Sequence, residues 1–229
     1  MITNVTMMLA VLVFGVTTSF AADAKSPGAR LLSVTGDVTI ESKEGGHLGK
    51  SGAALLPGDS VSTAAGATAV IELPDGSRLK LRELSKLAVT LPAGKSLVTE
   101  AYLTLGSVFA KVSKRLAGHE FRVRTTSAVA AVRGTEFFTA YGRSKGKARD
   151  LWVCVNEGAV DVETTKSKKV LQVPAGKGVL LKSGLDLTKP QAFEWTKTLN
   201  WNMDAEKGGL EDKTNLDGAY ADLLDQDYR

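Results

Sequence analysis

Apolar and charged residues alternate with a period of two along much of the chain. Leu79 and Leu81, for example, alternate with Arg78, Lys80 and Arg82. Successive side chains of a β-strand point to opposite faces, so each such run places its apolar residues on one side and its charged residues on the other. We therefore expect half-buried strands whose charged side faces solvent. The same alternation recurs at residues 37–41, 121–124 and 160–163.

Two segments, residues 128–132 and 151–155, are apolar at every position and predict central strands that are covered on both faces. Turn signals rich in Pro, Gly, Asn and Asp separate the strands at short intervals, as at residues 57–59 and 74–76. No helical period stands out between residues 31 and 182. This spacing is typical of a sandwich, a barrel or a solenoid and not of βαβ units.

A faint internal repeat refines this prediction. The pattern Gly-x-Val opens a strand at residues 36–38, 106–108 and 158–160, and the first and third copies are followed by a Pro-containing turn that leads to another Val. Coils of similar shape stacked on one another would explain the repeat, and so would chance recurrence of common turn residues. The predicted fold class is all-β, a stacked β-coil in the form of a β-helix-like roll with short C-terminal helices. The alternative is a β-sandwich.

The N-terminus has the features of an export signal. Residues 5–20 are almost entirely apolar or small, and small-x-small cleavage sites follow at residues 19–21 and 22–24. No Lys or Arg precedes the apolar run, which is unusual for such signals. The alternative is a single membrane anchor, although the run is short for a span of roughly 20 residues. We expect residues 1–24 to be a cleaved signal peptide. The chain would then be exported, and periplasmic if the cell has an outer membrane, with no integral membrane span after cleavage.

Catalytic or metal-binding chemistry finds little support. The chain has one Cys, Cys154, in an apolar strand pattern, and two His, His47 and His119, in a turn and at a strand start. These three residues do not form a zinc set, and no Ser lies in a nucleophile-elbow pattern. We expect no catalytic residue, no metal, no cofactor and no enzymatic activity.

Charge is distributed unevenly. Residues 1–184 hold 24 Lys or Arg and 15 Asp or Glu, whereas residues 185–229 hold 5 and 10. The acidic tail could fold back on the basic body, or stay solvated and contact another molecule. One basic loop is a candidate patch for an anionic ligand, although loops often carry Lys simply because they are solvated. Nucleic acid is disfavoured as a partner because no stacking aromatics interleave the basic clusters. The patch comprises Arg143, Lys145, Lys147 and Arg149.

Residues 185–229 are expected to form an acidic, partly helical appendage. Pro190 could start a helix, and Trp195 and Trp201 could dock it on the β body. Residues 204–213 have the composition of a polar linker. Residues 217–228 predict a weak second helix, which would become ordered on a partner or stay mobile.

The order of motifs resembles the FecR domain over residues 31–182, and we place the domain boundaries at 31–184. The series includes Leu-x-Pro-Gly-Asp-x-Val at residues 55–61, Leu-Pro-Asp-Gly-Ser-x-Leu-x-Leu at 73–81 and Val-Asn-Glu-Gly-Ala-Val-Asp-Val at 155–162. The most specific part is the core Arg133, Gly134, Thr135, Glu136 and Phe137. We expect this core to be mainly structural. Its Gly would mark a bulge or close backbone approach, and its Thr would bond to the neighbouring backbone.

The resemblance implies an envelope module and not an enzyme. The best-known members of the family are transmembrane anti-sigma regulators, whose periplasmic FecR domain relays a signal from an outer-membrane transporter. Here only four residues precede the apolar run, so direct control of a sigma factor is not expected. The predicted function is protein–protein interaction or signal relay in the cell envelope. Arg133 and Glu136 would be either exposed partner contacts, or paired or solvated residues of a folding element. The alternative is a binding module for an anionic envelope polymer or glycan.

Overall fold

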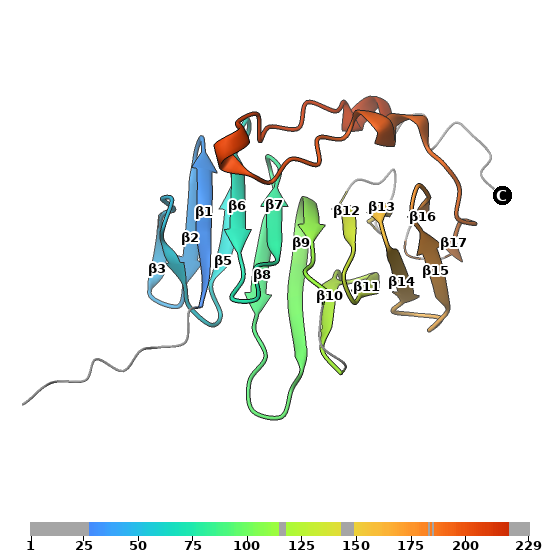
Figure 1. Ribbon diagram of the computed structural model, residues 1–229, viewed down its shortest axis with the longest axis horizontal. Helices are drawn as coiled ribbons and strands as arrows, with labels where there is room; N and C mark the ends of the chain where they lie inside the picture. The colour runs from blue at the N-terminus through green and yellow to red at the C-terminus, as the bar shows by residue number, and fades with distance from the viewer. Residues whose placement is uncertain (1–27, 115–117, 143–148, 183, 185, 220–229) are drawn as a thin grey trace, which may run out of the picture.

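The computed structural model describes residues 28–114, 118–142, 149–182, 184 and 186–219. The predicted signal peptide lies outside these residues. The described chain is predominantly β-structure with a few short helical turns (Figure 1). In chain order, the elements are β1 Ala29–Thr35, β2 Val38–Ser42, β3 Gly45–Leu48, β4 Ala54–Leu55, β5 Ser60–Thr63, β6 Thr68–Glu72, β7 Arg78–Leu81, β8 Lys86–Thr90, β9 Val98–Lys111, β10 Glu120–Arg124, β11 Ala128–Val132, β12 Glu136–Tyr141, β13 Leu151–Glu157, β14 Ala159–Thr164, β15 Val170–Pro174, β16 Gly178–Lys182 and β17 Asp186–Leu187, followed by the 3-10 helices η1 Glu194–Thr198 and η2 Ala205–Lys207.

The strands form two sheets that share one long strand, β9. The first sheet has the order β4-β1-β6-β7-β9-β12-β13-β16-β17. The second has the order β3-β2-β5-β8-β9-β10-β11-β14-β15. The N-terminal half of β9 pairs in the second sheet and its C-terminal half in the first. Among these pairings only β9–β10 is parallel.

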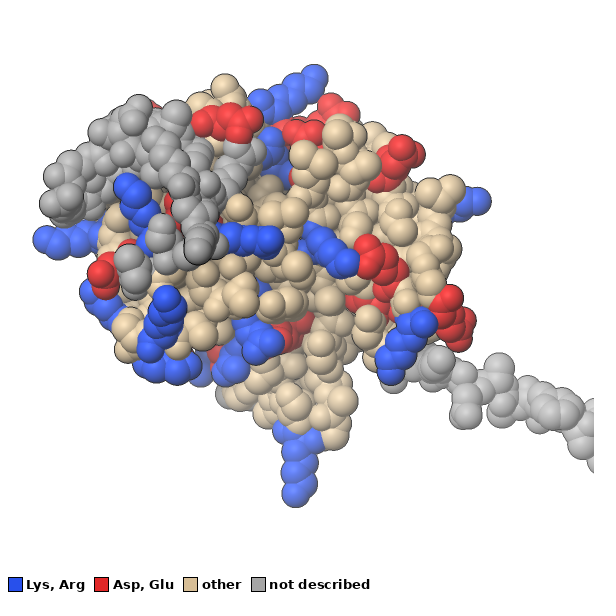
Figure 2. All heavy atoms as spheres, turned by 180° about the vertical axis from the view of Figure 1, so that it is seen from behind, with Lys and Arg blue, Asp and Glu red and all other residues tan. Residues whose placement is uncertain are grey.

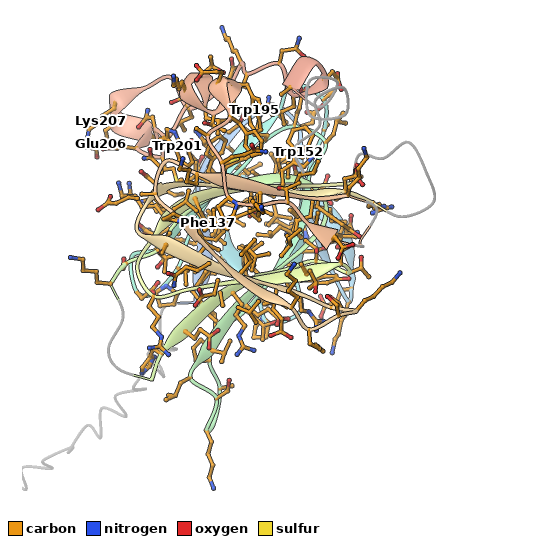
Figure 3. The ribbon with its side chains drawn as sticks, turned by 90° about the vertical axis from the view of Figure 1, so that its right-hand side faces the viewer. Phe137, Trp152, Trp195, Trp201, Glu206 and Lys207 are labelled. Atoms are coloured by element: carbon orange, nitrogen blue, oxygen red, sulfur yellow. The ribbon has the colours of Figure 1, made fainter. Side chains whose placement is uncertain are left out.

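The main hydrophobic core lies between the two sheets. Leu79 and Leu81 of β7 point into it as their alternation predicts, and Phe137 of β12 joins them from the same sheet. From the second sheet come Ile40 and Phe121. All five side chains are fully buried, and Figure 3 shows Phe137 between the layers. Each strand therefore stabilises the fold by removing one apolar face from water.

A third layer lies over the outer face of the first sheet. Residues 193–219, here called the strap, run along this sheet from the β16 end towards β6 and return (Figure 1). Beneath the strap lies a second apolar cluster that includes Phe109, Phe138 and Trp152. Figure 3 shows Trp152, Trp195 and Trp201 gathered between the strap and the first sheet. No comparable layer of described residues covers the outer face of the second sheet.

The all-β prediction is confirmed, whereas the stacked coil remains a prediction. Residues 151–155 are buried on both faces, as predicted. The matching prediction for residues 128–132 is wrong, because Val129 and Ala131 on the outer face are only half-buried. The reason is that β11 belongs to the second sheet, whose outer side the strap does not cover.

The C-terminal predictions need similar correction. The helix expected from Pro190 is the five-residue 3-10 helix η1, and the expected linker at residues 204–213 is part of the strap. Residues 216–219 are helical, and the later part of the predicted second helix lies outside the described residues. None of the helices among the described residues has the length and apolar character needed to cross a membrane.

Candidate interaction surfaces

The motif at residues 133–137 forms the corner where the chain passes from the second sheet to the first. Gly134 has φ 121°, and a Cβ there would lie 3.1 Å from the Cα of Lys114. The hydroxyl of Thr135 donates to the carbonyl oxygen of Ala159 at 3.1 Å, and its own carbonyl accepts from the amide of Val112 at 2.9 Å. A close approach and a hydroxyl bond of this kind are what the Gly-Thr step suggested. The motif joins three parts of the backbone.

Glu136 lies inside this corner and not on the surface. It is 7% exposed, accepts a hydrogen bond from the side-chain amide of Asn156 at 2.6 Å, and lies 3.4 Å from the Lys111 ammonium. Of the two alternatives for this residue, the structure therefore places Glu136 in a paired, internal position. Arg133 is exposed. Phe137 fills the main core, while its neighbour Phe138 points to the opposite face under the strap.

The basic loop proposed for anionic ligands is described only at Arg149. Arg143, Lys145 and Lys147 lie outside the described residues. The Arg149 guanidinium donates to the carbonyl oxygen of Thr104 at 2.8 Å and lies over the ring of Tyr141, 5.8 Å from its centroid. Arg149 is thus held against the protein surface. Figure 2 shows Lys and Arg side chains more numerous towards its left side and mixed with Asp and Glu over the rest.

The outer face of the first sheet carries an aromatic cluster, here called the seat. Phe109 and Phe138 lie with ring centroids 4.7 Å apart. Trp201 of the strap meets Phe109 edge-on at 5.3 Å, and Trp195 meets Trp152 at 5.4 Å. Aromatic pairs at such distances and tilts stabilise a contact beyond the area they bury. The seat comprises Phe109, Phe138, Ala140, Trp152, Cys154 and Leu180.

The cations of β7 attach the strap to this seat. Lys80 donates to the carbonyl oxygens of Asn200 and Asn202 at 2.5 and 2.7 Å, and its Nζ lies 4.4 Å from the Phe109 ring centroid. Arg82, directly after β7, pairs its Nε with the Asp212 carboxylate at 3.0 Å. Its Nη2 donates to the carbonyl oxygens of Asp212 and Thr214 at 3.1 and 3.0 Å. Hydrogen bonds from a cation are stronger than those between neutral groups.

These contacts overturn the expectation that the charged side of β7 faces solvent. Lys80 is completely buried and Arg82 is 8% exposed. Burial lowers the pKa of Lys80 to about 8 and also lowers the pKa of Arg82, while the charge of Asp212 opposes both shifts. The described part of the acidic tail therefore folds back on the body, which was one of the two alternatives. The sequence analysis did not identify Lys80 and Arg82 as the cations that bind the tail. The features that could have indicated this contact were the basic face of β7 and the acidic, Trp-containing tail.

The outer face of the second sheet is uncovered by other described residues, and we call it the open face. Most of its side chains form two rows of neighbours across the strands, and Thr39, Ser62 and Lys86 form a shorter third row at one end. One row is Glu41, Ser60, Ala88, Tyr102, Arg124, Val129, Glu163 and Val170. The other is Thr90, Glu100, Arg122, Ala131, Asp161 and Gln172.

The composition of the open face is mixed and not basic. The three rows hold four carboxylates, two guanidinium groups and the ammonium group of Lys86. Arg124 lies 3.3 Å from the Glu100 carboxylate and stacks over Tyr102, with 5.2 Å from its Cζ to the ring centroid. Ala88 and Ala131 have small side chains that are half-buried, so they do not block access of a partner to this part of the sheet. Tyr and Arg are enriched in protein interfaces, whereas a site for an anionic polymer would need an excess of cations.

A hollow of about 360 Å³ lies at the edge of the strap, between its last residues and the first sheet. Its floor includes Arg82, Ser107 and Trp152, and its rim includes Leu84 and Leu105, which are exposed apolar residues. Within the described ranges there is no group of three or more His, Cys, Asp or Glu placed to hold a metal ion. The hollow therefore offers space for a small ligand beside the last described residues of the strap.

Comparison with known proteins shows which family and which solved structures this chain is similar to. Residues 59–161 match the family described as FecR protein, which confirms the predicted resemblance over that stretch. Two crystal structures of a candidate anti-sigma factor from Parabacteroides distasonis, at 1.65 and 2.50 Å resolution, are similar in fold. Both have a TM-score of 0.51 and 21% sequence identity to this chain.

At this identity and coverage, the two solved structures are evidence for the fold alone. Each match covers 61% of this chain and 63% or 62% of the other, which is less than two thirds of the solved chains. No curated protein matches the sequence.

Proposed function

Residues 59–161 carry the FecR match, and from this premise we propose that the chain is a non-enzymatic regulatory module that binds another protein in the cell envelope. A regulatory role is favoured because the solved structures of similar fold are described as a candidate anti-sigma factor. The open face supports binding to a protein. It is the broad surface of the two-sheet body that the strap leaves uncovered, and it presents Tyr102 and Arg124 among small side chains.

Export is part of this proposal. Cleavage of residues 1–24 would release the module outside the cytoplasm, and into the periplasm if the cell has an outer membrane.

The path of the chain supports the finer fold proposal, a coil-like roll. The chain passes repeatedly between the two sheets, from β1 to β2, β4 and β5, and we infer that this winding is the coil-like roll suggested by the Gly-x-Val repeat.

The runner-up function, binding of an anionic polymer or glycan, gains no support from the open face. Four carboxylates outnumber three cationic groups in its rows, and a cationic surface is what such a ligand requires. The Arg149 guanidinium already bonds to Thr104. We therefore base the proposal on a protein partner.

The test is cross-linking in intact cells, followed by purification through a C-terminal tag and identification of the attached protein. Ala131→Arg would place a long charged side chain in the middle of the open face without touching the core. Ala65→Arg is the matched control, since Ala65 is exposed in the turn before β6. We expect the native chain and the control to recover the same partner, and Ala131→Arg to recover about tenfold less. Equal recovery by both variants would rule out the open face, and recovery of no specific protein by the native chain would rule out the function.

A further inference from the structure

The strap and the two-sheet body have separate hydrophobic cores. Among the described residues, the main core runs from Ala29 to Leu187 and includes no side chain of the strap. The strap instead contributes Phe193, Leu199 and Met203 to the cluster over the seat. The body can therefore keep its own core when the strap is absent from the sheet. Elements with this property open locally while the remaining structure stays folded.

Among the described residues, no backbone–backbone hydrogen bond joins the strap to the body. The last such bonds before the strap begins connect Gln191 with Gly178. The strap's own backbone bonds, such as Thr196 to Phe193 and Lys207 to Asp204, are internal to it. Its polar attachment to the described part of the sheet includes side chains on alternate positions at and after β7. They are Arg78, which donates to the carbonyl oxygen of Met203 at 3.4 Å, together with Lys80 and Arg82.

The interface beneath the strap also carries most of the unfavourable polar burial in the described chain. The indole N–H of Trp195 and the side-chain amide of Gln191 are buried without a hydrogen-bond partner. The Arg82 Nε and the Asp212 Oδ2 face each other as an ion pair, but not in hydrogen-bond geometry. Buried groups of this kind oppose the closed state, because they are better solvated when exposed. Away from the strap, the Thr139 hydroxyl is the other such group.

We propose that the strap is a lid that opens as one unit on the folded body and uncovers the seat for an extended segment of another protein. The closed strap shows what the seat accepts. Lys80 and Arg82 donate hydrogen bonds to main-chain carbonyl oxygens, which are present in any extended segment. The aromatic cluster packs against a side chain such as Trp201. The inference does not depend on the open face, because the seat lies on the other sheet.

Cys154 reports whether the lid opens. It is the single Cys of the chain, it belongs to the seat, and it is 2% exposed. A Cβ built on Gly178 would touch both its Sγ and the ring of Phe193, so the first strap residue lies beside the thiol. A thiol reagent added to the full-length chain should label Cys154 through opening of the strap. The labelling rate should then depend only weakly on urea, whereas labelling through global unfolding would depend on it steeply.

Asp212→Asn should raise the open population. It removes the charge that faces Arg82 but keeps the Oδ1 acceptor used by the amide of Asn200 and the hydroxyl of Thr214. Removal of one partner from a buried ion pair is strongly destabilising, so we expect labelling at least about tenfold faster than in the native chain. Glu41→Gln is the control, because it breaks an ion pair with Lys86 that is partly exposed on the second sheet. The control should label at the native rate.

A synthetic peptide with the sequence of residues 193–216 tests the seat itself. Added to the Asp212→Asn protein, it should slow labelling of Cys154, and a scrambled peptide of the same composition should not. If labelling of the native chain follows global unfolding at all urea concentrations, the lid is refuted, whatever happens to the variant. If the variant labels quickly but the peptide gives no protection, the strap opens without creating a site for an extended segment, and that part of the proposal is overturned.

Discussion

Replacement of Lys80 by Met should remove a defined part of the pH dependence of folding. Lys80 is fully buried under the strap, and burial lowers its pKa from 10.5 to about 8. Asp212 and Glu136 raise this pKa and Arg82 lowers it further, but burial is the largest cause. Between about pH 8 and 10.5 the unfolded chain therefore holds a proton that the folded chain has released. Stability rises with pH wherever the unfolded state binds more protons, and below pH 8 this contribution is constant.

The size of the effect follows from the two pKa values. With a folded value of about 8 and an unfolded value of 10.5, the free energy of unfolding gains about 1.4 kcal/mol from about pH 7 to 9, and about 2.5 kcal/mol by pH 10. Cys154 acts in the opposite direction. Burial raises the pKa of its thiol, so the folded chain keeps a proton that the unfolded chain loses above its ordinary value of 9.0. The Lys80 contribution must therefore be measured as a difference between two proteins that both contain Cys154.

Urea unfolding followed by tryptophan fluorescence provides that difference. The free energy of unfolding of the native chain minus that of Lys80→Met should be constant below about pH 8 and should then rise by the amounts given above. Lys86→Met serves as the control, because the Lys86 side chain is 39% exposed and forms its ion pair outside the strap. A Lys80 difference that stays flat from pH 7 to 10 would mean that this ammonium is hydrated, and that the strap does not cover it.

Three further outcomes test other parts of the structure. Glu136→Ala should lower the free energy of unfolding by about 0.5–1.5 kcal/mol in urea denaturation, since it removes a buried acceptor that bonds the Asn156 side-chain amide and faces the Lys111 ammonium, whereas Glu157→Ala on the exposed end of β13 should change it little. Gly106→Ala should destabilise far more than Gly66→Ala by the same measurement. Both glycines have positive φ, but a Cβ at Gly106 would lie 2.4 Å from a neighbouring backbone atom and one at Gly66 would meet nothing. Intact-mass measurement of the protein secreted by cells should show a chain lacking residues 1–24, and an unprocessed mass would contradict the export signal.

The alternation of apolar and polar residues predicted the strands well because that pattern is local. Leu79 and Leu81 point inwards as expected. The environment of Lys80 between them was predicted wrongly, because it depends on Asn200 and Asn202, about 120 residues later in the chain. A strand's own sequence shows which side chains share a face, but not what covers that face. The acidic composition of the tail and its tryptophans were the available signals, and they were compatible with both a docked and a free tail.

The family motif shows a similar limit. Gly134 and Thr135 predicted a close backbone approach, and the structure has it at Lys114 and Ala159. The same motif left open whether Glu136 is a surface contact or an internal one. The choice depends on Asn156, which the sequence places in a separate turn.

The continuity of β9 links the mechanics of the two sheets. Tyr102 on the open face and Phe109 under the strap lie on one uninterrupted strand, which changes sheets at the bend around Gly106. A slip of β9 by one residue would turn its own side chains to the wrong face in both sheets at once, so its alignment is fixed twice. A pull applied to either layer is therefore carried directly to the other along a single covalent backbone. Because β9 pairs with strands on both of its sides in each sheet, a change in its position would be felt in both layers.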